Sequence, residues 1–324
     1  MTTDATQAAI DTEALVEKYG NLKVPQLTMI MMGVIIVALI AVIIIGFVYI
    51  HRHFPDYANA IFIGVLSELI FGYLIYGGST FLLSKVDAVN TFMTNHETAY
   101  NAILVILSVI LDSLAVILGM KYLFKYNEKR NVRTNIGAAF TFGLAMYTAA
   151  IMTGQQLTFA FEYIMYGTMM NNLGLDTAIY QMMVNGVTEK DAVDSVNALI
   201  NTSWLKFLWE GCSYVLKALV KTCAAVIMYG IYKEKLERKL LYAGIGMIAA
   251  YFIPTLLNLL LKAPGALCIV LTVLITIGAV VLTAVLIHKH MPEDEEDIKR
   301  KPLKKKHYTD NSQQKMPKIV MPDD

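Results

Sequence analysis

The chain has 324 residues, of which 56% are hydrophobic and 16% charged, and its formal net charge is +1. This composition excludes the water-soluble classes and indicates an integral membrane protein. The basic residues are scattered over loops and one tail and form no stripe, so we expect no nucleic-acid partner. The three cysteines lie in apolar segments without a C-x-x-C pair, which argues against a disulfide framework and a zinc knuckle.

Seven apolar stretches are each long enough to cross a hydrocarbon core about 30 Å thick. Three of them contain no charged residue, and four carry a few ionisable groups. Together they predict an all-α, polytopic bundle of about seven transmembrane helices over residues 28–288. In chain order the stretches are Thr28–Ile50, Ala58–Leu83, Tyr100–Phe124, Asn135–Asn172, Trp204–Ile231, Leu240–Leu261 and Ala266–Ile287.

The fourth stretch is too long for one straight crossing, since a helix of its length would reach about 57 Å at about 1.5 Å per residue. It therefore crosses twice, or crosses once and bends. Two basic loops favour one crossing, because a cytoplasmic assignment of both requires an even number of crossings between them. We expect a break near Gly154 and a tilted or partly interfacial helix over Gln155–Met170. The loop residues are Lys125, Lys129, Arg130 and Arg133, then Lys233, Lys235, Arg238 and Lys239.

Counting outward from these loops places the N-terminus outside and the C-terminus inside. Residues 1–27 then form an external segment, in which Ala5–Lys18 is either a short surface helix or a frayed terminus. Residues 173–203 are expected to form an external cap of two helices. No basic n-region precedes the first stretch and no small-residue cleavage site follows it, so it is expected to be an anchor. The expected location is a bacterial plasma membrane.

The tail over residues 289–324 is too polar to pack, and we expect it to be disordered in the cytoplasm. An acidic block over residues 293–297 precedes a basic cluster close to the membrane. Such a cluster attracts anionic lipid, with about 1 kcal/mol offered by each basic residue. An ordinary topology-setting tail and the docking of a protein partner are the alternatives. The basic residues are Lys299, Arg300, Lys301, Lys304, Lys305 and Lys306.

Ionisable residues also lie inside the stretches, where each costs at least about 2.5–3.5 kcal/mol at the bilayer centre. In the fifth stretch polar residues recur every three or four positions, which places them on one face of a helix. Two acids and two bases fall at similar depth, and we expect ion pairs between them. These pairs either fix the helix register or belong to a path for an ion, a proton or a substrate. The stripe contains Lys206, Glu210, Ser213, Lys217 and Lys221, and the mid-membrane cluster contains Glu68, Asp112, Lys217 and Lys221.

Two further acids, Glu162 and Glu210, fall in the outer half of the bundle. We expect both to line a wet vestibule beneath the external cap. In the second stretch, the glycines Gly72, Gly77 and Gly78 are expected to serve close helix packing.

The sequence contains no recognisable catalytic constellation. All six histidines lie in loops, at the ends of stretches or in the tail, and H-E-x-x-H is absent. Ser113 beside Asp112 has no evident base partner, and no glycine-rich phosphate loop opens a helix. We therefore expect no catalytic residue, no metal and no cofactor.

Five segments nevertheless follow one another in a recognisable order. The segment Ile110–Lys125 contains Asp112-Ser113, Phe142–Tyr147 precedes Asn171-Asn-Leu173, and Glu210-Gly211 precedes Val226–Lys233. This order resembles the YhfC-type intramembrane metalloproteases of Gram-positive bacteria, relatives of the PrsW and CAAX-protease group. That family has a span with paired glutamates and an arginine, then Gly-x-Gly-His-x-x-x-Glu leading to Asn-Asn-Leu, and later Glu-Arg with a histidine.

The resemblance implies that the family's acids are partly kept. Asp112 and Ser113 take the places of the paired glutamates, and Val116 takes the place of the arginine. Glu210 and Gly211 take the places of the later Glu-Arg pair.

The resemblance also implies that the family's histidines are lost. Met146 takes the first histidine place, although a later register puts Thr158 there and Glu162 on the family's glutamate. Ala218 takes the place of the next histidine. The resemblance therefore implies a member that has lost its metal-ligand histidines.

The leading hypothesis from the sequence is a non-catalytic, metalloprotease-like membrane protein that binds a membrane or peptide partner. One alternative is an active intramembrane metalloprotease of that family with unusual ligands. A second alternative is a small transporter or ion-coupled permease that uses the mid-membrane cluster.

Overall fold

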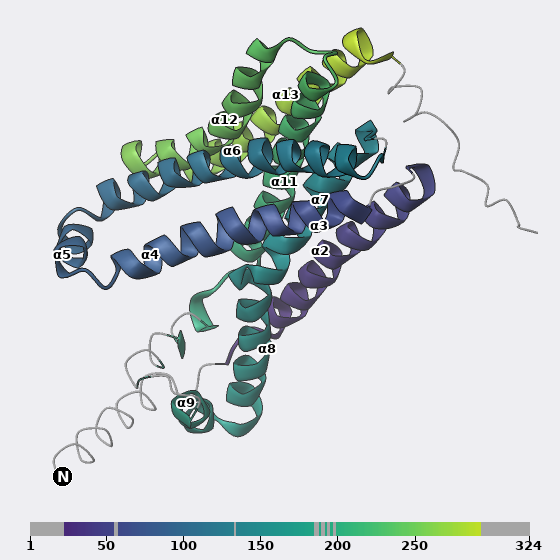
Figure 1. Cartoon of the computed structure of the whole chain (residues 1–324). Coiled ribbons are helices and arrows are strands. Elements are labelled where there is room, and N and C mark those ends of the chain that lie inside the picture. The colour runs from purple at the N-terminus through teal and green to yellow at the C-terminus, as the bar shows by residue number, and fades with distance from the viewer. Residues whose placement is uncertain are drawn as a thin grey trace, which may run out of the picture.

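The computed structural model describes residues 23–54, 58–132, 134–184, 188, 192, 195–196 and 199–292. All regular structure in these residues is helical (Figure 1). Three of the expectations concern residues outside this part of the chain. They are those for residues 1–22, for most of the second cap helix, and for the tail from residue 293 onward with its basic cluster.

Seven helical runs in the described residues are long and apolar enough to cross a membrane, which confirms the predicted all-α bundle. Helices are the expected form, because backbone N–H and C=O groups in lipid have no water to bind. Within the described residues, the shorter helices α5 (Asp87–Asn95) and α9 (Leu175–Val184) lie between runs. The runs are α2 (Gln26–His53), α3 with η1 and α4 (Ala58–Glu68, Leu69–Gly77, Gly78–Leu83), α6 (Glu97–Lys129), α7 with α8 (Ile136–Thr153, Gln155–Leu173), α11 (Trp204–Tyr232), η2 with α12 (Arg238–Leu240, Leu241–Leu261) and α13 (Gly265–His290).

The fourth run breaks at Gly154, as the sequence predicts. This residue ends α7 and begins α8 with an extended backbone, at φ −71° and ψ 153°. A Cβ atom at this position would lie 2.5 Å from the carbonyl oxygen of Ala150, so the break requires glycine. Beyond the break, α8 leaves the body of the bundle and runs toward α9 (Figure 1).

Helix α11 lies at the centre of the bundle and contacts α2, α6, α7, α12 and α13. Two hydrophobic cores form around it. One core lies mainly among α3, α6, α7, α11, α12 and α13, and the other among α2, α7, α8, α9 and α11. Small residues allow the closest crossings: a Cβ atom on Gly64 of α3 would lie 2.6 Å from the carbonyl oxygen of Phe142 in α7.

The second run contains a π-helical segment, η1, which starts directly after Glu68. A Cβ atom on Gly72 would lie 3.0 Å from Glu68 Oε1, so this glycine leaves room for the carboxylate. Gly77 and Gly78 have no neighbouring atom within 4 Å of such a Cβ position. The expectation that these two glycines serve close helix packing is therefore wrong, because the tight crossing of this run lies at Gly64 instead.

Both basic loops lie at the same end of the bundle, which we call the basic end. The rings of Phe124 in α6 and Tyr232 in α11 are 5.0 Å apart, so these two helices end side by side. Leu236 in the second loop packs with Met291, which follows α13, in one hydrophobic core. The number of crossings between the two loops is therefore even, in agreement with a single crossing by α7 and α8.

Candidate functional site

The polar stripe occupies one face of α11. The helix begins after Ser203, whose side chain accepts a hydrogen bond from the Leu205 N–H at 3.3 Å. Since an α-helix repeats every 3.6 residues, polar side chains spaced by three and four positions share a face. Toward the basic end this face meets α3 and α6, and toward the opposite end it meets α8 and α12.

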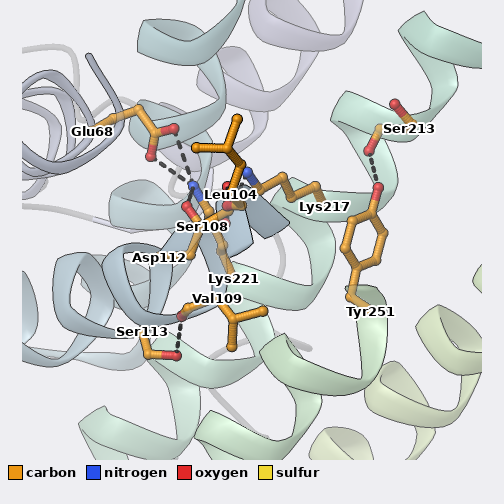
Figure 2. Close-up of polar contacts among 10 residues, drawn as sticks. All are labelled: Glu68, Leu104, Ser108, Val109, Asp112, Ser113, Ser213, Lys217, Lys221 and Tyr251. Carbon is orange, nitrogen blue, oxygen red and sulfur yellow. Dashed lines mark hydrogen bonds and ion pairs between the residues drawn. The ribbon is translucent and has the colours of Figure 1, made fainter. Parts of the chain in front are cut away.

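The mid-membrane cluster forms where α3, α6 and α11 come together (Figure 2). The Lys221 ammonium lies 3.1 and 2.8 Å from the two carboxylate oxygens of Glu68 and 2.8 Å from Asp112 Oδ1. Asp112 Oδ2 lies 2.8 Å from the Lys217 ammonium. The expected ion pairs are therefore present, and two carboxylates balance two ammonium groups.

The two lysines of the cluster differ in burial. Lys221 is 3% exposed, like its buried partners Glu68 and Asp112, whereas the Lys217 side chain is 31% exposed. Asp112 Oδ2 has no hydrogen-bond partner of good geometry in the described residues and depends on the Lys217 charge. The Lys217 ammonium also lies 5.2 Å from the centroid of the Phe252 ring, a cation–π distance. Lys217 is thus the member of the cluster that reaches open space.

That open space is a cavity of about 680 Å³ between α11, α12 and α13, which we call the α11–α13 cavity. Lys217 and Lys206 line it from α11, and Pro254 and Asn258 line it from α12. The Tyr251 hydroxyl at its wall donates a hydrogen bond of 2.7 Å to the Ser213 carbonyl (Figure 2). This bond ties α12 to α11 beside the cavity.

A small cavity of about 50 Å³ adjoins the cluster and is lined by Glu68, Lys217 and Lys221. Since one water molecule needs about 10–15 Å³, this cavity has room for water beside the buried charges. Met146 of α7 and Ala218 of α11 also line it. In one of the two registers of the family resemblance, these two positions take the places of histidines, whereas the other register puts Thr158 in the first place.

A third cavity, of about 490 Å³, lies between α8 and α11, and we call it the α8–α11 cavity. Its wall contains Glu210, which accepts a hydrogen bond of 3.1 Å from the Gln156 amide. Gln156 is 6% exposed, and its Oε1 atom has no hydrogen-bond partner in the part of the chain that the structure describes. Lys206 lines the same cavity.

Glu162 does not share this cavity with Glu210. The face of α8 turned toward the protein carries Gln156, Ala160 and Tyr163, which are all buried. Glu162 falls outside that face and is exposed. The expected vestibule is therefore corrected: it contains Glu210 and the polar Gln156, and Glu162 lies on the surface of α8.

The three cavities meet at Tyr214 of α11, which lines all of them. Lys206 and Ser213 line both larger cavities. Sequence reasoning missed Gln156, Tyr214 and Tyr251. Gln156 lies two residues after the predicted break in an otherwise apolar stretch, which is a usable signal. Tyr214 and Tyr251 gave no such signal in the sequence, since aromatic residues are common in membrane helices.

No group of three or more His, Cys, Asp or Glu side chains converges within the described residues. The acids that the resemblance equates with the family's acids lie in separate places. Asp112 is bound by two lysines, Glu210 is bound by Gln156, and Glu162 is exposed.

Comparisons with known proteins give no match. No protein-family model matches the chain, and neither the curated proteins nor the solved structures contain a match. The YhfC resemblance therefore stays a prediction, and the function has to be derived from the cavities and the cluster.

Proposed function

We propose that this multi-pass membrane protein is a small permease in which one face of α11 lines the path of a charged solute. The observation that carries the proposal is the set of three cavities that meet at Tyr214 of α11, two of which reach the neutral mid-membrane cluster. Ionisable residues inside a membrane protein typically mark such paths when they face a water-filled cavity. The geometry favours this alternative over the leading hypothesis from the sequence, because the polar face of α11 borders open space.

Lys217 connects the path to the cluster. An anionic group that arrives in the α11–α13 cavity can replace Asp112 as the partner of Lys217, while Asp112 keeps its ion pair with Lys221. Each carboxylate then still contacts an ammonium group, because Lys221 contacts both Glu68 and Asp112, and the bound anion adds one net negative charge to the cluster. The second run has a place to bend, because η1 follows Glu68 directly and π-helical segments are frequent at functional sites.

Uptake into liposomes tests the permease. Purified protein is reconstituted, and the uptake of radiolabelled pools of inorganic anions, carboxylates, amines and amino acids is measured. We expect saturable uptake of at least one pool, reduced about tenfold or more by Lys217→Met. Glu162→Gln, outside the path, is the matched control and leaves uptake unchanged. Uptake that equals protein-free liposomes for every pool contradicts the proposal.

We also propose that the basic end faces the cytoplasm of a bacterial cell, with the N-terminus outside. The positive-inside rule supports this orientation. Exposed lysines at the two ends of the bundle, Lys85 and Lys239, serve as reporters in a cysteine-free background. In intact cells, an impermeant thiol reagent is expected to label Lys85→Cys and to spare Lys239→Cys. The reverse pattern contradicts the orientation.

A second candidate is the non-catalytic, metalloprotease-like protein that binds a membrane or peptide partner. The observation that favours it is the convergence of Met146 and Ala218 on one small cavity. If these positions derive from metal ligands, the double variant Met146→His, Ala218→His should bind zinc more tightly than the unmodified chain, as isothermal titration would detect. Stoichiometric metal in the unmodified protein would instead indicate the active metalloprotease.

For the tail, reversible association with anionic lipid remains a proposal carried by the six basic residues of its cluster, at positions 299–306. Full-length protein and a chain truncated after residue 292 are compared for the effect of anionic lipid in nanodiscs. In the full-length chain, the tail should be protected from protease in anionic nanodiscs and not in neutral ones, and salt should remove the protection. The truncated chain should yield no tail fragment, which identifies the protected band.

A further inference from the structure

The α8–α11 cavity carries an acid and a base that are not paired with each other. Glu210 and Lys206 lie one helical turn apart on α11 and both line the cavity. Within the described residues, Lys206 has no ion-pair partner, and the hydrogen bond to Glu210 comes from the neutral Gln156 amide. Both charges therefore remain available to a ligand.

One side of this cavity suits an ammonium group. The Gln156 amide is oriented by Glu210, because a carboxylate only accepts hydrogen bonds and so fixes the NH₂ group against it. This orientation leaves Gln156 Oε1 as a buried acceptor without a partner. The Glu210 carboxylate lines the cavity and can accept hydrogen bonds from an ammonium group, and a rotation of the Gln156 side chain would bring its buried amide oxygen to the same ligand.

The other side suits a carboxylate. Lys206 supplies an ammonium group at the cavity wall, one turn from Glu210. Lys206 also lines the α11–α13 cavity, which Lys217 borders farther along the same helix. A carboxylate bound at Lys206 therefore has a second cationic partner at the next position of the path.

The remaining wall of the cavity is aromatic. Phe159 and Phe207 pack with ring centroids 6.1 Å apart, and Tyr214 lies farther along α11. The volume of about 490 Å³ falls in the usual range of small-molecule sites, about 300–1,000 Å³. An apolar wall beside two opposite charges matches a small zwitterion with an apolar side chain.

We infer that the α8–α11 cavity binds a free amino acid, with its ammonium group on Glu210 and Gln156 and its carboxylate on Lys206. The inference rests on the proposed permease and names its substrate class. It also explains why the path needs acidic and basic groups at its start and a lysine at its next position.

Equilibrium binding tests the inference without transport. Full-length protein in nanodiscs is titrated with each common amino acid, and with the amine and the carboxylic acid that lack one of the two charged groups. At least one amino acid should bind at micromolar to millimolar concentration. Its amine and its acid should each bind about tenfold or more weakly, since each loses one charge-assisted contact.

Two variants separate the two ends of the site. Glu210→Gln should weaken the amino acid about tenfold or more and leave the affinity for the carboxylic acid unchanged. Lys206→Met should weaken the amino acid and leave the affinity for the amine unchanged. A merely structural role would weaken all three ligands together. Glu162→Gln, an exposed glutamate on α8, is the control and should change none of them.

The outcomes distinguish this inference from the permease itself. If no common amino acid binds, or if the amine binds as tightly as the amino acid, the zwitterion site is overturned. Uptake of another solute that depends on Lys217 would then leave the permease intact. Binding with the crossed pattern of the two variants, but without uptake into liposomes, would support the site and overturn the permease.

Discussion

The two halves of α11 have the same spacing of polar residues but differ in whether their charged side chains are paired with opposite charges. In the half toward the basic end, Lys221 contacts two carboxylates and Lys217 contacts one, so the charges cancel. In the other half, Lys206 and Glu210 line an open cavity, and Glu210 hydrogen-bonds to a neutral amide. We call the first the closed half, because its charges pair with one another even though Lys217 borders the α11–α13 cavity, and the second the open half, because it leaves its charges to a ligand.

The difference comes from the helices that cover the stripe. Toward the basic end, α3 and α6 pack against α11 and each presents one carboxylate. Toward the other end, α8 diverges after the break at Gly154 and presents Gln156. Periodicity thus decides which residues share a face, while the covering helices decide whether those charges are neutralised or remain available.

The largest expected effect is the removal of the shared base. Lys221→Met leaves Glu68 and Asp112 buried without their common ammonium, and should lower the free energy of unfolding by about 3–5 kcal/mol. Unfolding in a graded series of detergent mixtures measures the loss. Lys206→Met, at the open half, is the matched control and should cost less than about 0.5 kcal/mol. Equal losses for the two lysines would erase the contrast between the halves.

The second prediction concerns the half-exposed member of the cluster. Asp112→Asn and Lys217→Met are measured singly and together. The double variant should lose about 1–3 kcal/mol less unfolding free energy than the sum of the two single losses. The reason is that each single change leaves one buried charge without its partner. Additive losses would show that the Lys217 charge does not stabilise the buried Asp112 carboxylate.

The third prediction tests how tightly the closed half is packed. Gly72→Ala pushes a methyl group against the Glu68 carboxylate, whereas Gly77→Ala extends into open space. Both changes remove a glycine from the same helical run, so their effects on helix propensity are similar. Gly72→Ala should be less stable than Gly77→Ala by about 1 kcal/mol in detergent unfolding. Equal stability would mean that Glu68 moves aside freely.

Much of the fold follows from the sequence. The length of the apolar stretches predicts the spans, and the basic loops predict that α7 and α8 make one crossing. The sequence also locates the break at Gly154, since a stretch of that length has to bend. The packing glycines were not predictable in the second run, because an isolated glycine does not reveal which helix crosses it. Gly64 meets α7, whereas Gly77 and Gly78 meet nothing within 4 Å.

The candidate site was predictable in part. The charges of the mid-membrane cluster had to pair, because unpaired charges are too costly at that depth. The sequence did not reveal that Lys221 bridges both acids, since that depends on the rotation of three helices. The placement of Glu162 failed for the same reason: the register of α8 against α11 turns Gln156 inward and Glu162 outward.

The smallest expected effect on stability comes from neutralising Glu210 in the open half, and the same substitution at Glu68 in the closed half serves as the comparison. Glu210→Gln keeps an acceptor for the Gln156 amide and removes a charge that faces a cavity, so stability should change by less than about 1 kcal/mol. Glu68→Gln removes the same charge from a residue that is 7% exposed and ion-paired, and should cost clearly more.

Added salt should change the small Glu210 effect and not the Glu68 effect, because solvent ions screen only charges that water reaches. The two melting curves at low and high salt measure both differences. A Glu210 loss as large as the Glu68 loss would mean that both halves of α11 are closed, and the amino-acid site would then have no free acid to offer.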